Sequence, residues 1–114
     1  MMENRSPSSP VGLEVGRFLL SWARTVLEST VRKVRLVPPS SPPAGARISR
    51  GVFVTLRTGP ELRGCIGWVR SPKPLVPSVQ EMTVASATRD PRFDPVCEGD
   101  LGSIDIQLSI LSPP

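Results

Sequence analysis

The chain has 114 residues, with 14 Lys/Arg against 10 Asp/Glu and no histidine. This length limits it to one domain, and the missing histidine excludes Cys–His and Ser–His catalytic pairs and histidine-containing zinc sites. Two cysteines, Cys65 and Cys97, are too few for a disulfide framework or a metal site. Without an apolar leader or an apolar run of about 18 residues, the sequence is typical of a cytoplasmic protein with reduced thiols.

The charge is unevenly distributed along the chain. Residues 1–73 carry 12 Lys/Arg and 4 Asp/Glu, a net charge of +8, whereas residues 74–114 carry 2 and 6, a net charge of −4. A basic half can attract phosphates, so RNA binding is one hypothesis. The basic residues are spread over a predicted helix, a loop and a hairpin, however, and a solvated basic surface is the favoured interpretation.

The first predicted element is an amphipathic helix. Residues 1–10 (MMENRSPSSP) are predicted to be disordered, and residues 11–114 to form the domain, with a proline-rich loop over residues 37–47. Apolar residues recur with helical spacing over residues 12–34, so a helix with one apolar side is expected there. That side consists of Val15, Phe18, Leu19, Trp22, Val26 and Leu27.

A β-hairpin is predicted next, with strands at residues 51–57 and 62–69 joined by the turn TGPE. On the second strand, simple alternation places Leu62, Ile66 and Trp68 on the face of Gly64. It places Arg63, Cys65 and Gly67 on the other face, unless a bulge shifts the phase.

The chain is then expected to form a second helix and a third strand. The helix should begin at Pro74 or Pro77, end at Thr88 and be terminated by DPRF (residues 90–93). Residues 104–112 (IDIQLSILS) alternate cleanly between apolar and polar residues, which indicates a strand. The order α-β-β-α-β predicts an α+β fold in which an antiparallel sheet, made of the hairpin and the C-terminal strand, is covered by two helices.

The segment LRGCIG (residues 62–67) is the candidate functional site. Two glycines beside Cys65 indicate that another group packs closely on this backbone, either the helix around Ala85 or a ligand. In the ligand interpretation Arg63 would favour the thiolate of Cys65, and the glycines Gly64 and Gly67 would leave the backbone amides around Cys65 free to bind an oxyanion or phosphate. In the alternative, Cys65 is a small buried residue without chemistry. Cys97 is interpreted as incidental, and Asp90 and Arg92 as anchors of the helix end.

Three motifs in order, LRGCIG, DPRF and IDIQLSILSPP (residues 104–114), make the chain resemble the AMMECR-type domain family. The resemblance implies an α+β fold and a place in the AmmeMemoRadiSam system, where the protein works with Memo-like and radical-SAM proteins. It implies no established reaction or cofactor. Family domains continue beyond LSPP, so the final strand is either an exposed edge or part of a truncated domain.

Three functions therefore remain as hypotheses. The first is an accessory or binding subunit that works with Memo-like and radical-SAM partners through LRGCIG. The second is an enzyme that depends on Cys65 as the catalytic thiol, with Arg63, Gly64 and Gly67 as binding residues. The third is an RNA-binding or RNA-modification-related module. The sequence does not decide whether the protein is an enzyme, nor does it define its oligomeric state.

Overall fold

The computed structural model describes residues 12–113. Within them, helix α1 (Leu13–Arg32) is followed by the short 3-10 helix η2 (Ala44–Arg47), and then by strands β1 (Val52–Thr58) and β2 (Glu61–Trp68). Helix α2 (Leu75–Thr88), the 3-10 helix η3 (Glu98–Ser103) and strand β3 (Ile104–Ile110) complete the order. The expected disorder of residues 1–10 falls outside the described residues.

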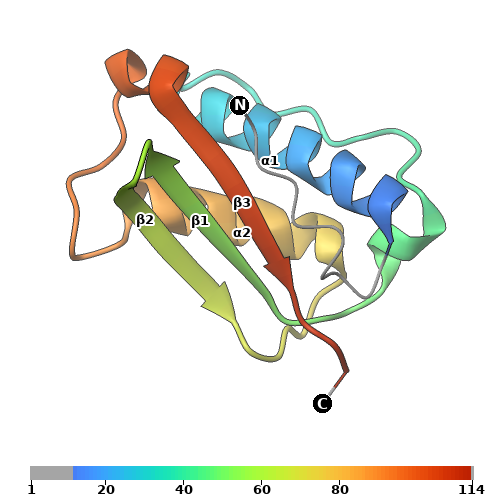
Figure 1. The fold of residues 1–114 in the computed structure, drawn as a ribbon. Coiled ribbons are helices and arrows are strands. Elements are labelled where there is room, and N and C mark those ends of the chain that lie inside the picture. The colour runs from blue at the N-terminus through green and yellow to red at the C-terminus, as the bar shows by residue number, and fades with distance from the viewer. Residues whose placement is uncertain (1–11, 114) are drawn as a thin grey trace.

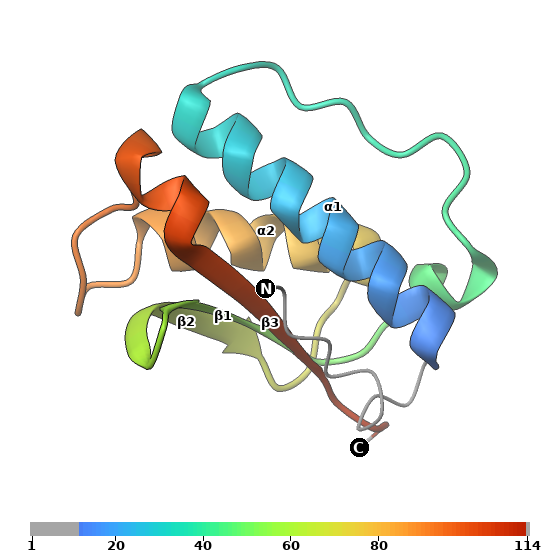
Figure 2. The ribbon, with the colours of Figure 1, turned by 45° about the horizontal axis from the view of Figure 1, so that its top comes forward.

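The three strands form one antiparallel sheet in the order β2-β1-β3. Strand β1 pairs with β2 through the tight turn at Gly59, whose φ of 59° suits glycine, and with β3 on its other side. Helices α1 and α2 lie on one face of this sheet, and no described element covers the other face (Figures 1 and 2). The predicted α+β fold is confirmed.

The core lies between the helices and one face of the sheet. The buried strand residues follow the alternation that the sequence shows, because paired residues of an antiparallel sheet point to the same side. They are joined by the apolar sides of both helices: the buried set includes Val52, Val54, Leu56, Ile104, Ile106, Leu108, Leu19, Val26, Leu27, Leu75 and Val79.

Polar contacts fix α1 to the other elements. The indole Nε1 of Trp22 donates to the carbonyl of Val76 in α2 at 3.0 Å. The guanidinium of Arg24 donates to the carbonyls of Leu101 and Ile104, where η3 leads into β3. Each bond joins segments more than 50 residues apart in the chain, so α1 is fixed to both α2 and the start of β3.

One expectation about β2 is wrong. The register pairs Arg57 with Leu62 and Leu56 with Gly64, which leaves Arg63 as an extra residue in a β-bulge. Because a bulge shifts the alternation by one residue, Leu62 shares a face with Arg57 rather than with Gly64. Ile66 and Trp68, paired with Val54 and Val52, do lie on the helix side as expected.

Candidate functional site

The LRGCIG segment forms the middle of β2, an edge strand of the sheet. Gly64 lies directly beneath helix α2. A Cβ added to it would lie 2.2 Å from the carbonyl oxygen of Ser86, a separation that real Cβ atoms essentially never show. Close packing by this helix, one of the two predicted explanations, therefore accounts for the glycine.

Ser86 also contacts the strands through its side chain. Its hydroxyl accepts a hydrogen bond from the amide of Ile66 at 3.0 Å and donates one to the carbonyl of Val54 at 2.9 Å. One buried hydroxyl of α2 thus bridges the backbones of β1 and β2. This bridge fixes the height of the helix above the sheet, and that height leaves no room for a side chain at residue 64.

The DPRF segment binds the outer edge of β2 at Cys65. Oδ2 of Asp90 accepts from the amide of Cys65 at 3.0 Å, and Nη2 of Arg92 donates to the carbonyl of Cys65 at 3.2 Å. Asp90 and Arg92 also bond each other through Nη2, Nε and the amide of Arg92. The two motifs of the sequence are therefore one hydrogen-bonded unit.

Asp90 is a buried carboxylate, with a side chain that is 1% exposed. The hydrogen bond from the Arg92 side chain holds its pKa well below the ordinary value, and the amides of Cys65 and Arg92 act in the same direction, while burial opposes them. The pairing correspondingly raises the pKa of Arg92. Asp90 is thus ionised at neutral pH and stabilises the edge of β2 through charge-assisted hydrogen bonds.

The Cys65 thiol lies on the sheet face opposite the helices, because Cys65 pairs with Thr55 across the sheet. Its Sγ is 3.2 Å from Oγ1 of Thr55, and either atom can donate the proton. Cys65 is half-buried and forms no disulfide with the other cysteine, Cys97. On the other side of Thr55 stands Gln107 of β3, so Cys65, Thr55 and Gln107 form a row across this face.

Gly67 belongs to the neighbouring row on the same face, where it pairs with Phe53. A Cβ at Gly67 would lie 2.4 Å from Cγ of Phe53 and 2.3 Å from the carbonyl oxygen of Val52. The aromatic ring of the adjacent strand therefore occupies the space that a side chain at residue 67 would need.

Arg63 is directed toward η3. Its Nη2 pairs with Oδ2 of Asp100 at 2.9 Å, and its side chain is 19% exposed. The amide and thiol of Cys97 donate to the same carboxylate oxygen, at 3.0 and 3.2 Å. These Cys97 bonds, followed by the charge of Arg63, lower the pKa of Asp100. Cys97, which sequence reasoning set aside, helps to hold the partner of Arg63.

The four predicted site residues thus lie on one strand but have different neighbours. The recorded contact of Arg63 is Asp100, whereas the guanidinium bound at Cys65 comes from Arg92. The amides of Cys65 and Ile66, which were expected to be free, donate to Asp90 and Ser86. Sequence reasoning missed the roles of Asp90 and Arg92, although the DPRF motif was the signal that could have revealed them. A catalytic or ligand-binding role for Cys65 stays a prediction.

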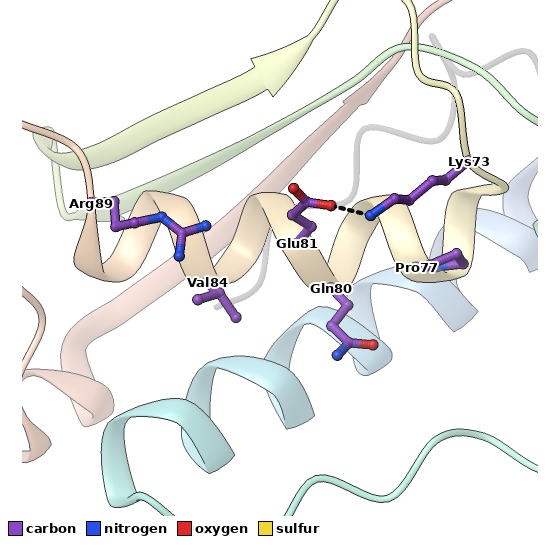
Figure 3. A pocket seen from close by; sticks show the side chains of 6 residues that line it. All are labelled: Lys73, Pro77, Gln80, Glu81, Val84 and Arg89. Carbon is purple, nitrogen blue, oxygen red and sulfur yellow. Dashed lines mark hydrogen bonds and ion pairs between the residues drawn. The ribbon is translucent and has the colours of Figure 1, made fainter.

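The surface also carries a shallow groove of about 320 Å³ along the outward face of α2 (Figure 3). Its lining comes from α2 and the residues at its two ends: Lys73, Pro77, Gln80, Glu81, Val84 and Arg89. Nζ of Lys73 is paired with the carboxylate of Glu81 within it. The groove is therefore separate from LRGCIG. In the part of the chain that the structure describes, no helix is long and apolar enough to cross a membrane.

Comparison with known proteins connects this arrangement to a family. Residues 20–114 match the AMMECR1 family, and the chain belongs to it. A protein of Methanothermobacter thermautotrophicus is 41% identical over 107 residues, which cover 93% of this chain and 56% of the relative. A protein of Thermotoga maritima is 40% identical over 99 residues, covering 83% of this chain and 57% of the relative.

A solved structure shares the fold as well. The crystal structure of an uncharacterized protein from Pyrococcus horikoshii superposes with a TM-score of 0.79 at 34% identity. The match covers 89% of this chain and 53% of the other. The chain thus spans about half the length of these relatives, so what is described here corresponds to part of their domain.

Proposed function

We propose that this AMMECR1-family chain is a binding subunit that works with a Memo-like and a radical-SAM protein, and that Cys65 does no covalent chemistry. The observation that supports this is the internal use of the LRGCIG segment. Its polar groups are bonded within the chain, because the backbone of Cys65 is bonded by Asp90 and Arg92, and Arg63 is paired with Asp100.

An enzyme built on Cys65 would need different surroundings. A nucleophilic thiol needs a base or a stabilising cation at the sulfur, together with free donors for a developing oxyanion. Here the sulfur lies 3.2 Å from the hydroxyl of Thr55, and the nearby guanidinium of Arg92 donates to the carbonyl of Cys65 and the carboxylate of Asp90. The adjacent amides of Cys65 and Ile66 are already engaged. The geometry therefore favours a structural role for the segment.

The partner surface that we propose is the sheet face opposite the helices. Within residues 12–113 no element covers it (Figure 2), and its central row, Cys65, Thr55 and Gln107, includes the cysteine of the family motif. Thr55 at its centre is buried, so half-buried Cys65 and Gln107 offer the accessible atoms of the row. The row is uncharged, so it can lie against another protein without leaving a buried charge unpaired.

Binding to the purified Memo-like and radical-SAM proteins from the same organism tests this proposal. Gln107→Arg places a long charged side chain in the central row and should abolish capture. Gln80→Arg, the matched control in the α2 groove (Figure 3), should leave capture unchanged. Both variants must retain the circular dichroism spectrum of the parent. Equal capture by Gln107→Arg, or no capture by the parent, would overturn the proposal.

The enzyme hypothesis is tested separately by thiol chemistry. We expect Cys65→Ser to retain partner capture. Iodoacetamide should label the native parent no faster than it labels the urea-unfolded chain. Native labelling much faster than that of the unfolded chain, absent in Cys65→Ser and combined with loss of cellular function in that variant, would favour the enzyme instead.

A further inference from the structure

A second candidate site lies at the end of the hairpin away from its turn. A surface pocket of about 260 Å³ is enclosed by the segment that enters β1 and the segment that leaves β2. Its lining residues are Ser49, Arg50, Gly51, Val69, Arg70 and Ser71. Two arginines and no carboxylate therefore face one small pocket.

The two arginines lack acidic partners among the described residues. The recorded hydrogen bond of the Arg50 side chain goes from Nη1 to the carbonyl of its neighbour Ser49, at 2.9 Å. Its Nε is buried and has no acceptor among the described residues. Arg70 is exposed, and within residues 12–113 no side chain pairs with its guanidinium. Unlike Arg63 and Arg92, which are paired with carboxylates, these two arginines bring positive charge to one pocket without a carboxylate.

The walls of the pocket are fixed by the backbone. The amide of Leu111 donates to the carbonyl of Gly51 at 2.9 Å, and the amide of Leu75 donates to the carbonyl of Ile48 at 2.8 Å. These bonds attach the segment before β1 to the end of β3 and to the start of α2. Gly51 packs against the backbone of β2, since a Cβ there would lie 2.1 Å from the carbonyl oxygen of Val69. The backbone that carries Arg50 is therefore fixed against the end of β2, while the side chains of both arginines keep their freedom to turn.

We infer that this pocket binds a phosphate group, held between the guanidinium groups of Arg50 and Arg70. Guanidinium groups bind phosphate oxygens through paired, charge-assisted hydrogen bonds. If the Arg50 side chain rotates, its Nε, which has no acceptor among the described residues, and its Nη2 can both donate to one phosphate group. The volume accommodates a phosphate with a small attached group. Exposed Val69, at 69% exposure, adds an apolar surface at the rim. This inference does not rest on the proposed function.

The phosphate could belong to a small phosphorylated ligand or to RNA, and the experiment separates these sources. Three probes are titrated at constant ionic strength: inorganic phosphate, adenosine monophosphate and a labelled single-stranded ten-nucleotide RNA. We expect the amide NMR signals of Gly51, Val69 and Ser71 to shift. Arg50→Gln and Arg70→Gln should each weaken binding about tenfold or more. Arg35→Gln, which removes the same charge from an exposed loop, should change it less than about twofold.

The relative affinities of the probes and variants identify the ligand class or exclude the site. If adenosine monophosphate binds as tightly as RNA, the site serves small phosphorylated ligands. If RNA binds much more tightly and its affinity falls steeply with salt, the site serves a polynucleotide. If Arg35→Gln weakens binding as much as Arg50→Gln, the attraction is diffuse and the site does not exist. If no probe shifts the pocket signals, the inference is equally wrong.

Discussion

At the scale of single residues, the contact between Gly64 and Ser86 explains most about the LRGCIG motif. The carbonyl of Ser86 occupies the space above Gly64, and the hydroxyl of the same residue bonds to both β1 and β2. Helix α2 therefore cannot rise to admit a side chain without breaking both of these hydrogen bonds, of which the one to Val54 is buried.

Gly64→Ala should consequently destabilise the protein by about 2–4 kcal/mol, since overpacking and lost hydrogen bonds both contribute. Gly102→Ala is the matched control, because a Cβ at Gly102 meets nothing within 4 Å, and it should change stability by less than about 0.5 kcal/mol. Urea unfolding followed by circular dichroism measures both. Equal effects of the two substitutions would contradict the close-packing explanation.

Asp90 is the other residue on which the β2 edge depends. Its pKa is lowered in the folded protein, chiefly by the side chain of Arg92. The unfolded chain binds a proton at this residue near pH 4. The stabilisation by Asp90 is therefore complete above about pH 5 and is lost as the pH falls through 4 toward the lower folded pKa.

Asp90→Asn should lower the free energy of unfolding by about 1–3 kcal/mol at pH 7, because an amide replaces a charge-assisted acceptor for Cys65 and Arg92. The difference between the parent and the variant should shrink as the pH falls from 5 to 3. Denaturant unfolding at a series of pH values measures it. A difference that stays constant over this range would show that Asp90 does not act through its charge.

At the scale of elements, β3 pairs with β1 along one edge, and no described strand pairs with its other edge. The amide of Leu111 bonds to Gly51 of the segment before β1, so the alternate residues Ser109, Gln107 and Asp105 also direct their amides toward β1. Ile106, Leu108 and Ile110 direct theirs outward. The carbonyl of Ile104 on this outer edge is covered by Arg24, but no strand pairs with the edge among the described residues.

Hydrogen exchange should therefore alternate along β3 in the isolated chain. The amides of Gln107 and Ser109 should exchange slowly, whereas those of Leu108 and Ile110 should exchange much faster, although their side chains are more deeply buried. Residue-resolved NMR exchange measures this pattern. Uniform protection along the strand would mean that another strand pairs with the outer edge, as sheet edges readily allow.

At the scale of the whole molecule, one core joins both helices to the sheet. The bond from Trp22 to Val76 connects the helices to each other, and Trp22 itself is 5% exposed. Because no described element has a separate core, the chain should unfold in one cooperative transition.

Trp22→Phe removes the indole N–H that donates to the carbonyl of Val76. The free energy of unfolding should fall by about 1–3 kcal/mol. Trp68→Phe, at a half-buried position on the edge strand, should cost less. In both variants the unfolding curves from tryptophan fluorescence and from circular dichroism should coincide. Separate transitions would indicate that the helices and the sheet unfold independently.

The sequence alone determined the order and type of the elements. Helical spacing from Val15 to Leu27 and strict alternation from Ile104 to Ile110 are local patterns, and each follows from one element burying one face. The same patterns indicate the α+β class, and three motifs in order, LRGCIG, DPRF and IDIQLSILSPP, indicate the family. The expected core residues of α1 are buried, apart from Phe18, which is partly so.

Only the tertiary structure decided what the motif residues contact. The bulge at Arg63 depends on how β2 pairs with β1, and it moved Leu62 to the other face. The bonds of Cys65 to Asp90 and Arg92 join residues 25 and 27 positions apart, and those of Ser86 bring three elements together. Such contacts depend on how elements pack, because a hydrogen bond across the fold leaves no periodic trace in the chain.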